Sequence, residues 1–267
     1  MEIVQCPSTL LPGPEVARCF GYRTYLAEPQ ARWLVPTGGV KLIIRFGDPL
    51  RSAFGTSGAV PVSASAVVVG PKDGPGRTVH AGEVHSLQLS LTPLGAYSLL
   101  GVPMRALSGA AVDLADVLGP GVNRLVERLA LTGDWGARFR LLARVFGERM
   151  ALGHRPDPAV VWAWQRLCGS GGGVSVSELA TEIGMSRRHL SRRFHDQVGL
   201  PPKSLARVLR FRRALRLRKA VPQRSWSRIA AECGYYDQAH FNADFRALAG
   251  CTPTESVSRS DGLVLPD

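Results

Sequence analysis

The 267-residue sequence has few cysteines, fewer acidic than basic residues and no long apolar run. Its five cysteines are scattered without a Cys-x-x-Cys pair, so we expect reduced thiols, and their spacing gives no indication of a redox sensor. The apolar runs are short and broken by Gly and Pro, so we expect no transmembrane helix. The N-terminal segment lacks a basic region before an apolar core, so we expect no secretory signal and a cytoplasmic location.

Two segments of the chain repeat one pattern: residues 176–204, the first unit, and residues 226–255, the second unit. Each unit predicts a short helix, a Gly turn, a second helix and a Gly-x-x-Pro stop. This arrangement is a helix-turn-helix, and two copies in tandem indicate a protein that binds duplex DNA. The residues that recur are Ala180, Glu182, Gly184, His189, Phe194, Gly199 and Pro202, which return as Ala230, Glu232, Gly234, His240, Phe245, Gly250 and Pro253.

Local signals inside the first unit explain why these helices begin and end where they do. Ser175 and Glu178 have the spacing of a capping box, which starts a helix. Gly184 fits a left-handed residue that ends this helix, and Ser186 fits the N-cap of the next one. Apolar residues recur at helical spacing in both units, so each helix has one face for a core.

The chain's excess of positive charge lies in this region. The formal net charge is +12, and residues 187–228 alone hold fourteen Lys and Arg residues against the single acid Asp196. Such a block attracts phosphates and releases counterions on binding. A basic block can also be a solvated helix face or a membrane-surface helix, and the two units could be ordinary helical hairpins. Two matches in register with a basic outward face favour DNA.

The C-terminal region resembles the AraC/XylS family of bacterial transcription regulators over about residues 174–256. The stretch from Gly234 to Pro253 is similar to the family's second recognition segment, and Leu190 to Phe194 is similar to the first. Leu205, Ser256 and Pro201 depart from the usual family pattern. The resemblance implies a one-component regulator that binds promoter DNA, with RNA polymerase as a partner and an N-terminal domain that binds a small effector or forms a homodimer.

The second helix of each unit is expected to enter the major groove. Arg hydrogen-bonds guanine through two donors, Gln and Asn pair with adenine, and Ser can contact either base. The predicted base contacts are Arg188, Ser191, Arg192, Gln238, Ala239 and Asn242. Helix N-termini and basic side chains would bind phosphates. The predicted phosphate contacts are Ser186, Arg187, Arg193, Arg207, Arg210, Arg213 and His240, although Arg210 could instead brace the domain internally.

The rest of the chain predicts an α+β protein with a β-rich N-terminal sensor domain, then helices, then an all-α C-terminal domain. The expected division is 1–168 for the sensor or dimerisation domain, 169–173 for a flexible Gly-rich linker, 174–256 for the DNA-binding domain and 257–267 for a loose tail. Strands are predicted at 40–46, 60–62, 66–69 and 84–91, in a small barrel or sandwich. Helices are predicted near 114–118, 122–129, 135–150 and 157–168, and on the third of these Arg138 should face outward.

Other candidate sites are weaker. His80 and His85, with Glu83 between them, suggest a metal site, but five residues apart on one strand they would face opposite sides, so no metal and no cofactor is expected. An aromatic effector pocket is predicted near Trp33, Phe46 and Phe54. No catalytic residues are predicted, because no nucleophile–base pair, carboxylate pair or metal cluster stands out, and Cys6 and Cys19 lack the clustered partners of an alkyl-transfer centre. The alternatives are an enzyme fused to a DNA-binding domain and a non-specific architectural DNA binder.

Overall fold

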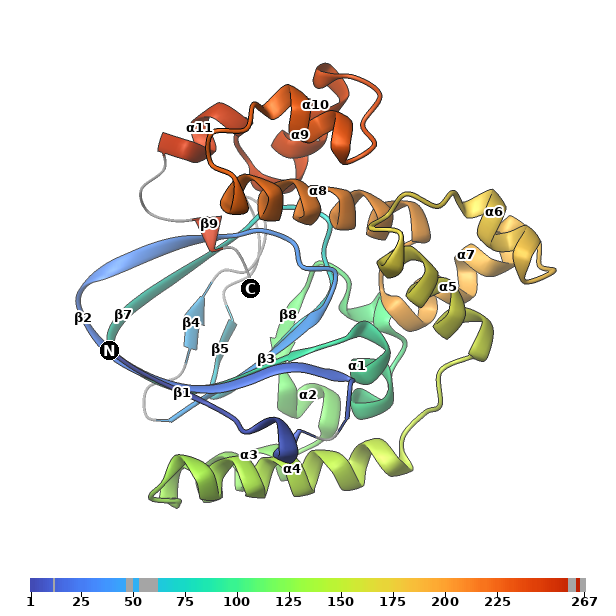
Figure 1. The fold of residues 1–267 in the computed structure, drawn as a ribbon. Coiled ribbons are helices and arrows are strands. Elements are labelled where there is room, and N and C mark those ends of the chain that lie inside the picture. The colour runs from blue at the N-terminus through green and yellow to red at the C-terminus, as the bar shows by residue number, and fades with distance from the viewer. Residues whose placement is uncertain (12, 47–49, 53–61, 259–262, 265–267) are drawn as a thin grey trace.

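The computed structural model of the chain describes residues 1–267 apart from 12, 47–49, 53–61, 259–262 and 265–267. A curved antiparallel sheet occupies the N-terminal part, and helices make up the rest (Figure 1). The strands are β1 (Glu2–Gln5), β2 (Val16–Leu34), β3 (Val40–Arg45), β4 (Leu50–Ser52), β5 (Val62–Ala64), β6 (Ala66–Val69), β7 (Gly76–Leu91), β8 (Ala111–Asp113) and β9 (Leu263–Val264), with short 3₁₀ helices η1 (Ser8–Leu10) and η2 (Met104–Leu107).

The sheet is built around one long pair of strands. Its order is β1-β2-β7-β3-β6-β8; β9 also pairs with β2, and β4 and β5 form a separate ladder. β2 and β7 run antiparallel along almost their whole length, from Val16 opposite Leu91 to Leu34 opposite Gly76. A register shift between Leu26 and Gln30 interrupts this ladder. Such irregularities bend a strand, which fits the strong curvature of the pair in Figure 1.

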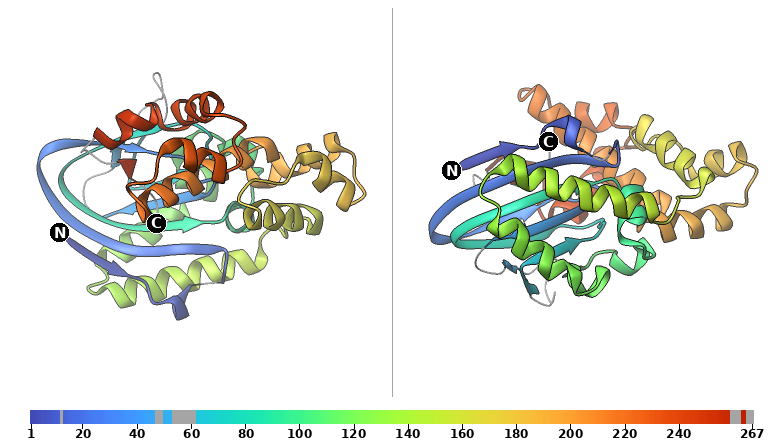
Figure 2. Two further views of the ribbon diagram at one scale, coloured as in Figure 1. Left: turned by 45° about the horizontal axis from the view of Figure 1, so that its top comes forward. Right: turned by 90° about the horizontal axis from the view of Figure 1, so that it is seen from below.

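Helices cover one face of this sheet. α1 (Pro93–Leu100), α2 (Leu114–Leu118), α3 (Gly121–Leu131) and α4 (Trp135–Leu152) follow β7, and α3 and α4 lie on the side of the sheet away from the C-terminal helices (Figure 2). Leu42 and Ile44 of β3 pack with Phe139 and Phe146 of α4 in this core. The burial of these apolar side chains stabilises the N-terminal part.

The prediction that Arg138 faces outward is wrong. Its guanidinium lies over the rings of Phe46 and Trp135, 4.8 Å from each centroid, and its Nε donates to the carbonyl of Leu129 at 2.9 Å. Only 7% of the residue is exposed. Aromatic faces and one carbonyl therefore compensate the buried charge, which a helical periodicity count cannot anticipate.

The C-terminal helices share a second core. They are α5 (Pro158–Gly169), α6 (Val176–Glu182), α7 (Arg187–Val198), α8 (Pro202–Ala220), α9 (Trp226–Glu232), α10 (Gln238–Ala249) and α11 (Pro253–Ser258). Val35 and Leu94 from the N-terminal part are buried in the same core, as are Val160 and Leu167 of α5. The helix before the expected linker thus packs with the helices after it.

The Gly-rich segment 169–173 forms a hydrogen-bonded turn. The amides of Gly171 and Gly172 donate to the carbonyls of Cys168 and Leu167, at 3.0 and 2.9 Å. A Cβ on Gly172 would lie 2.3 Å from the carbonyl oxygen of Ala206, so only glycine fits beside α8. The domain division at residues 169–173 remains a prediction, and this packing favours a DNA-binding domain that begins with α5.

The α+β class with an N-terminal sheet and a C-terminal helix-turn-helix region is confirmed. The predicted strands 40–46, 66–69 and 84–91 fall on β3, β6 and the second half of β7, while residues 60 and 61 of the remaining predicted strand lie outside the described part. None of the predicted strands covers the 19-residue β2. No helix in the described residues is long and apolar enough to cross a membrane.

Candidate DNA-binding surface

The first unit consists of α6, a Gly turn and α7. The Ser175 hydroxyl accepts a hydrogen bond from the Glu178 amide at 3.2 Å, and the Glu178 carboxylate accepts one from the Ser175 amide at 2.8 Å, which completes the capping box. These hydrogen bonds lower the pKa of Glu178. Gly184 has φ +65°, and the Ser186 hydroxyl accepts from the His189 amide at 3.2 Å to cap α7. The local signals in the sequence thus place both helices of this unit.

The second unit repeats this geometry in α9 and α10. Gly234 has φ +74°, and Asp237 caps α10 by accepting from the His240 amide at 2.7 Å. The N-cap is therefore an acid in this unit and a neutral Ser in the first. Phe241 and Phe245 hold α10 against Trp226 in the core, with ring centroids 5.7 and 5.5 Å from that indole.

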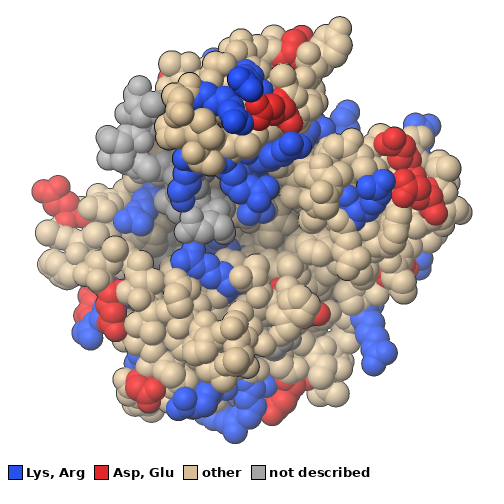
Figure 3. Space-filling model, in the orientation of Figure 1, with Lys and Arg blue, Asp and Glu red and all other residues tan. Residues whose placement is uncertain are grey.

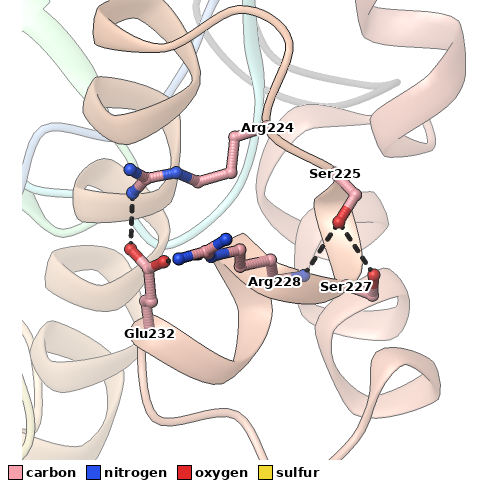
Figure 4. A network of polar contacts seen from close by, with 5 residues as sticks. All are labelled: Arg224, Ser225, Ser227, Arg228 and Glu232. Carbon is pink, nitrogen blue, oxygen red and sulfur yellow. Dashed lines mark hydrogen bonds and ion pairs between the residues drawn. The ribbon is translucent and has the colours of Figure 1, made fainter.

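A polar network fixes the start of α9 (Figure 4). Glu232 accepts from Arg224 at 2.6 Å and from Arg228 at 3.2 Å, and the Ser225 hydroxyl lies 3.4 Å from the Arg228 amide. The equivalent acid of the first unit, Glu182, pairs with Arg166 of α5 at 3.6 Å. In each unit the recurring Glu thus ties the first helix to an Arg from the segment before it.

The predicted base contacts all reach the outer surface of α7 and α10. The structure leaves five of them exposed and Ser191 half-buried; the exposed ones are Arg188, Arg192, Gln238, Ala239 and Asn242. Arg188 and Arg192 are one helical turn apart, so both can enter one groove. Their role in base recognition remains a prediction, as does that of the other four residues.

Several of the residues predicted to contact phosphates already have intramolecular partners. Arg207 pairs with the buried Asp244 at 2.9 Å, and Arg193 pairs with Asp157. Arg210 donates to the carbonyl of Gly172 at 3.2 Å and lies over the Tyr235 ring, which favours the bracing alternative. Ser186, Arg187, Arg213 and His240 are exposed.

Basic side chains gather on and below the C-terminal helices in the face that Figure 3 shows. Half-buried Arg212 of α8 donates to the carbonyl of Thr37 at 2.9 Å and so ties α8 to the segment after β2. Burial and the neighbouring Arg216 lower the pKa of Arg212. Part of the basic block thus holds the two parts of the chain together and is not available to DNA.

The two units touch the N-terminal part at equivalent glycines. A Cβ on Gly199 would lie 2.7 Å from Pro71 and 2.9 Å from the carbonyl oxygen of Met104. A Cβ on Gly250 would lie 3.4 Å from Pro75. The loop between β6 and β7 therefore lies against the end of the second helix in both units.

The curved sheet encloses a cavity of about 290 Å³. Its described lining includes four basic side chains and no acidic one: Arg18, Arg32, Lys41 and Arg45. Lys41 also lines a second hollow beside α8, together with Arg212. Burial and the charges of Arg18 and Arg212 lower the pKa of Lys41.

Of the three residues predicted for an effector pocket, the two that the structure describes, Trp33 and Phe46, do not line this cavity. Phe46 is buried against His85 and Trp135, with ring centroids 4.9 and 6.3 Å away, and does not line the cavity. Trp33 lies beside Gly250. Phe54 lies outside the described residues. Most of the cavity residues belong to β2, β3 and β7, and Ile3 of β1 joins them.

The two histidines considered for metal binding are separated by the sheet. His80 lines the cavity, whereas His85 packs on Phe46 and Trp135. Burial lowers the pKa of His80 to about 4, and the positive charges of Arg45 and Arg32 contribute to this shift. His80 is therefore neutral at pH 7. Among the described residues, no three His, Cys, Asp or Glu side chains lie close enough together to hold a metal.

Sequence reasoning missed one cluster in the N-terminal part. Cys6 and Cys19 are separated in the sequence, but they come together where β1 ends beside β2. The long β2 strand, which was not predicted, brings them together.

Comparison with known proteins identifies one part of the chain. The helix-turn-helix domain family matches residues 179–259. No curated protein matches the chain. Among solved structures, ToxT from Vibrio cholerae O395 is 11% identical, with 91% of this chain and 97% of that chain covered and a TM-score of 0.48.

Two further structures are similar to parts or most of the chain. Unsaturated fatty acid bound ToxT from Vibrio cholerae strain SCE256 is 13% identical over 89% of this chain and 93% of that chain, with a TM-score of 0.46. The C-terminal domain of AraT, a response regulator from Geobacillus stearothermophilus, is 24% identical over 38% of this chain and 85% of that chain, with a TM-score of 0.36.

Proposed function

Because residues 179–259 belong to the AraC type of helix-turn-helix domain of DNA-binding transcription regulators, we propose that the protein is a sequence-specific, effector-responsive regulator of the one-component type. The observation that carries this proposal is the pair of units in register, with Arg188 and Arg192 exposed on one recognition helix and Gln238 and Asn242 on the other. RNA polymerase and a second copy of the chain are the further partners we propose.

In this proposal α7 and α10 enter two successive major grooves on one side of the duplex. Arg188, Ser191 and Arg192 contact bases in one half of the site, and Gln238, Ala239 and Asn242 contact bases in the other. Ser186, Arg187, Arg213 and His240 contact phosphates. Arg193, Arg207 and Arg210 reach phosphates only if they give up or share their present partners. The smaller set of phosphate contacts is therefore the better supported one.

The N-terminal part senses the effector in this proposal, and the sheet cavity is its binding site. Half-buried Lys41 lies near Arg18 and Arg212, so an effector with a negative charge would gain most there. Residues 1–168 as the sensor and 174–256 as the DNA-binding domain remain our proposed division. An enzyme fused to a DNA-binding domain would be revealed by turnover of a metabolite.

Selection of bound fragments from random DNA tests the proposal. The full chain should enrich one sequence with a footprint of about twenty base pairs and no need for an internal palindrome, because two major grooves are about 34 Å apart. The variant Arg188→Ala with Arg192→Ala is the control, and it should lose enrichment in one half of the site. Equal affinity for random and selected DNA would instead identify an architectural binder.

The salt dependence of binding provides a second measurement on the selected site. If only Arg187, Arg213 and His240 contact phosphates, log K should fall against log[salt] with a slope of roughly −2 to −3. If Arg193, Arg207 and Arg210 join them, the slope should be roughly −5. A slope shallower than about −2 would contradict the proposed phosphate contacts.

A further inference from the structure

The end of β1 places two cysteines directly opposite one another. β1 and β2 are antiparallel, with Gln5 opposite Phe20, so the next pair in register is Cys6 and Cys19. The amide of Cys6 donates to the carbonyl of Cys19 at 2.9 Å, which continues the ladder to this pair. Hydrogen-bonded pairs in an antiparallel ladder have Cα atoms about 5.5 Å apart, within the roughly 4.4–6.8 Å that a disulfide spans.

The side chains of this pair also face one another. Both side chains line the same small apolar hollow, the Cys6 thiol donates to the carbonyl of Pro7 at 3.6 Å, and neither cysteine is disulfide-bonded. Cys6 is half-buried and borders solvent, whereas Cys19 is 4% exposed and packs with Phe139 and Phe146 of α4. Burial raises the pKa of both thiols, most strongly that of Cys19. A reagent therefore reaches Cys6 first.

The strand that ends just before Cys6 contributes to one wall of the cavity. β1 lies at the edge of the sheet and pairs with β2 over four residues. Ile3 of β1 lines the cavity, and Glu2 accepts a hydrogen bond from the Trp135 indole at 3.0 Å. A covalent bond at Cys6 would therefore hold this wall in place.

We propose that Cys6 and Cys19 form a reversible disulfide that fastens β1 to β2. The step needs an oxidant, for which a small disulfide such as oxidised glutathione suffices. The Cys6 thiolate attacks one sulfur of the oxidant and releases one thiol. The Cys19 thiolate then displaces the second thiol from Cys6, so two protein thiols become one disulfide and the oxidant becomes two thiols. Because the thiolate is the reacting form, the reaction is slow at neutral pH and faster in mild alkali.

Intact mass spectrometry of the full chain with oxidised glutathione tests this proposal. The protein should lose two hydrogens, peptide mapping should join the segments around Cys6 and Cys19, and dithiothreitol should reverse both changes. Cys6→Ala should keep its mass or gain one glutathione at another thiol. A stable glutathione adduct on Cys6 of the unaltered protein, or the same loss of two hydrogens in Cys6→Ala, would overturn the proposal.

Two further measurements, the unfolding temperature and the DNA affinity, separate the disulfide from folding defects and from the proposed regulator function. The oxidised protein should unfold at a temperature a few degrees higher than the reduced protein, because the bond closes a loop of twelve residues in the unfolded chain. An unchanged unfolding temperature would contradict the fastening of β1. Any effect of the disulfide on effector binding rests on the proposed function and is measured separately by DNA affinity, so the mass and unfolding results test the disulfide whether or not that function holds.

Discussion

The two helix-turn-helix units share a frame but differ in where their charges are engaged. On α7, Arg193 pairs with Asp157 and Asp196 pairs with Arg105, both partners lying before the unit. On α10, Asp244 is buried against Arg207 of α8. The first unit therefore uses exposed or half-buried ion pairs to attach to segments before it, and the second uses one buried acid to attach to α8.

This difference changes how the charge of the second recognition helix should be counted. By sequence, residues 237–248 hold Arg246 against Asp237 and Asp244, a net charge of −1. Asp244 is neutralised internally and Asp237 caps the helix, so neither acid need face phosphates as the count implies. The outward surface of α10 is then close to neutral, whereas α7 exposes Arg187, Arg188 and Arg192.

The largest effect should come from removing α5, on which the first unit rests. Val160 and Leu167 are fully buried in the shared core, and α5 contacts α7 and α8. A fragment of residues 170–258 should therefore be less stable than one of residues 156–258 by roughly 3–6 kcal/mol. Urea unfolding of the two fragments measures this. Equal stabilities would show that the domain begins after the Gly-rich turn.

The second-largest effect separates the buried ion pair from the exposed one. Asp244→Asn leaves the half-buried Arg207 without its counter-charge and should lower the free energy of unfolding by about 2 kcal/mol. The matched variant Asp196→Asn breaks a pair whose side chains are 39% and 56% exposed, and it should cost under about 0.5 kcal/mol. If both variants cost the same in denaturant unfolding, the contrast between the units is lost.

Sequence patterns were sufficient for the C-terminal helices because their signals are local. Caps such as Ser175 and glycines such as Gly184 act within one turn of the chain, so spacing alone predicts them. Contacts between distant segments were not predictable in this way. Arg212 with Thr37, Arg138 over Phe46, and Cys6 beside Cys19 each depend on tertiary packing that no short window of sequence contains.

The third effect concerns DNA affinity, and it tests whether the outward charge of α7 and α10 determines how much each helix contributes to binding. Arg192→Ala should weaken binding by about 1–3 kcal/mol and relax base choice in one half of the site, the size of one good guanine contact. Gln238→Ala should cost under about 1.5 kcal/mol and relax only the other half, because a neutral contact contributes less. Titration of both variants on the same selected site decides between them. A larger loss for Gln238→Ala would overturn this ranking.

The smallest effect compares the caps that begin the two units. In the first unit, Ser175 and Glu178 satisfy one another's amides with hydrogen bonds of 3.2 and 2.8 Å. In the second, Arg228 stands at the position of Glu178, and the Ser225 hydroxyl lies 3.4 Å from its amide and shares a bond with Ser227. Ser175→Ala should therefore cost about 1 kcal/mol in unfolding free energy, and Ser225→Ala about half of that. Glu178→Gln is the control for charge, since it keeps the reciprocal hydrogen bond and should cost less than Ser175→Ala. Equal losses for the two Ser variants would mean that the network around Glu232, and not the cap, fixes how each unit begins.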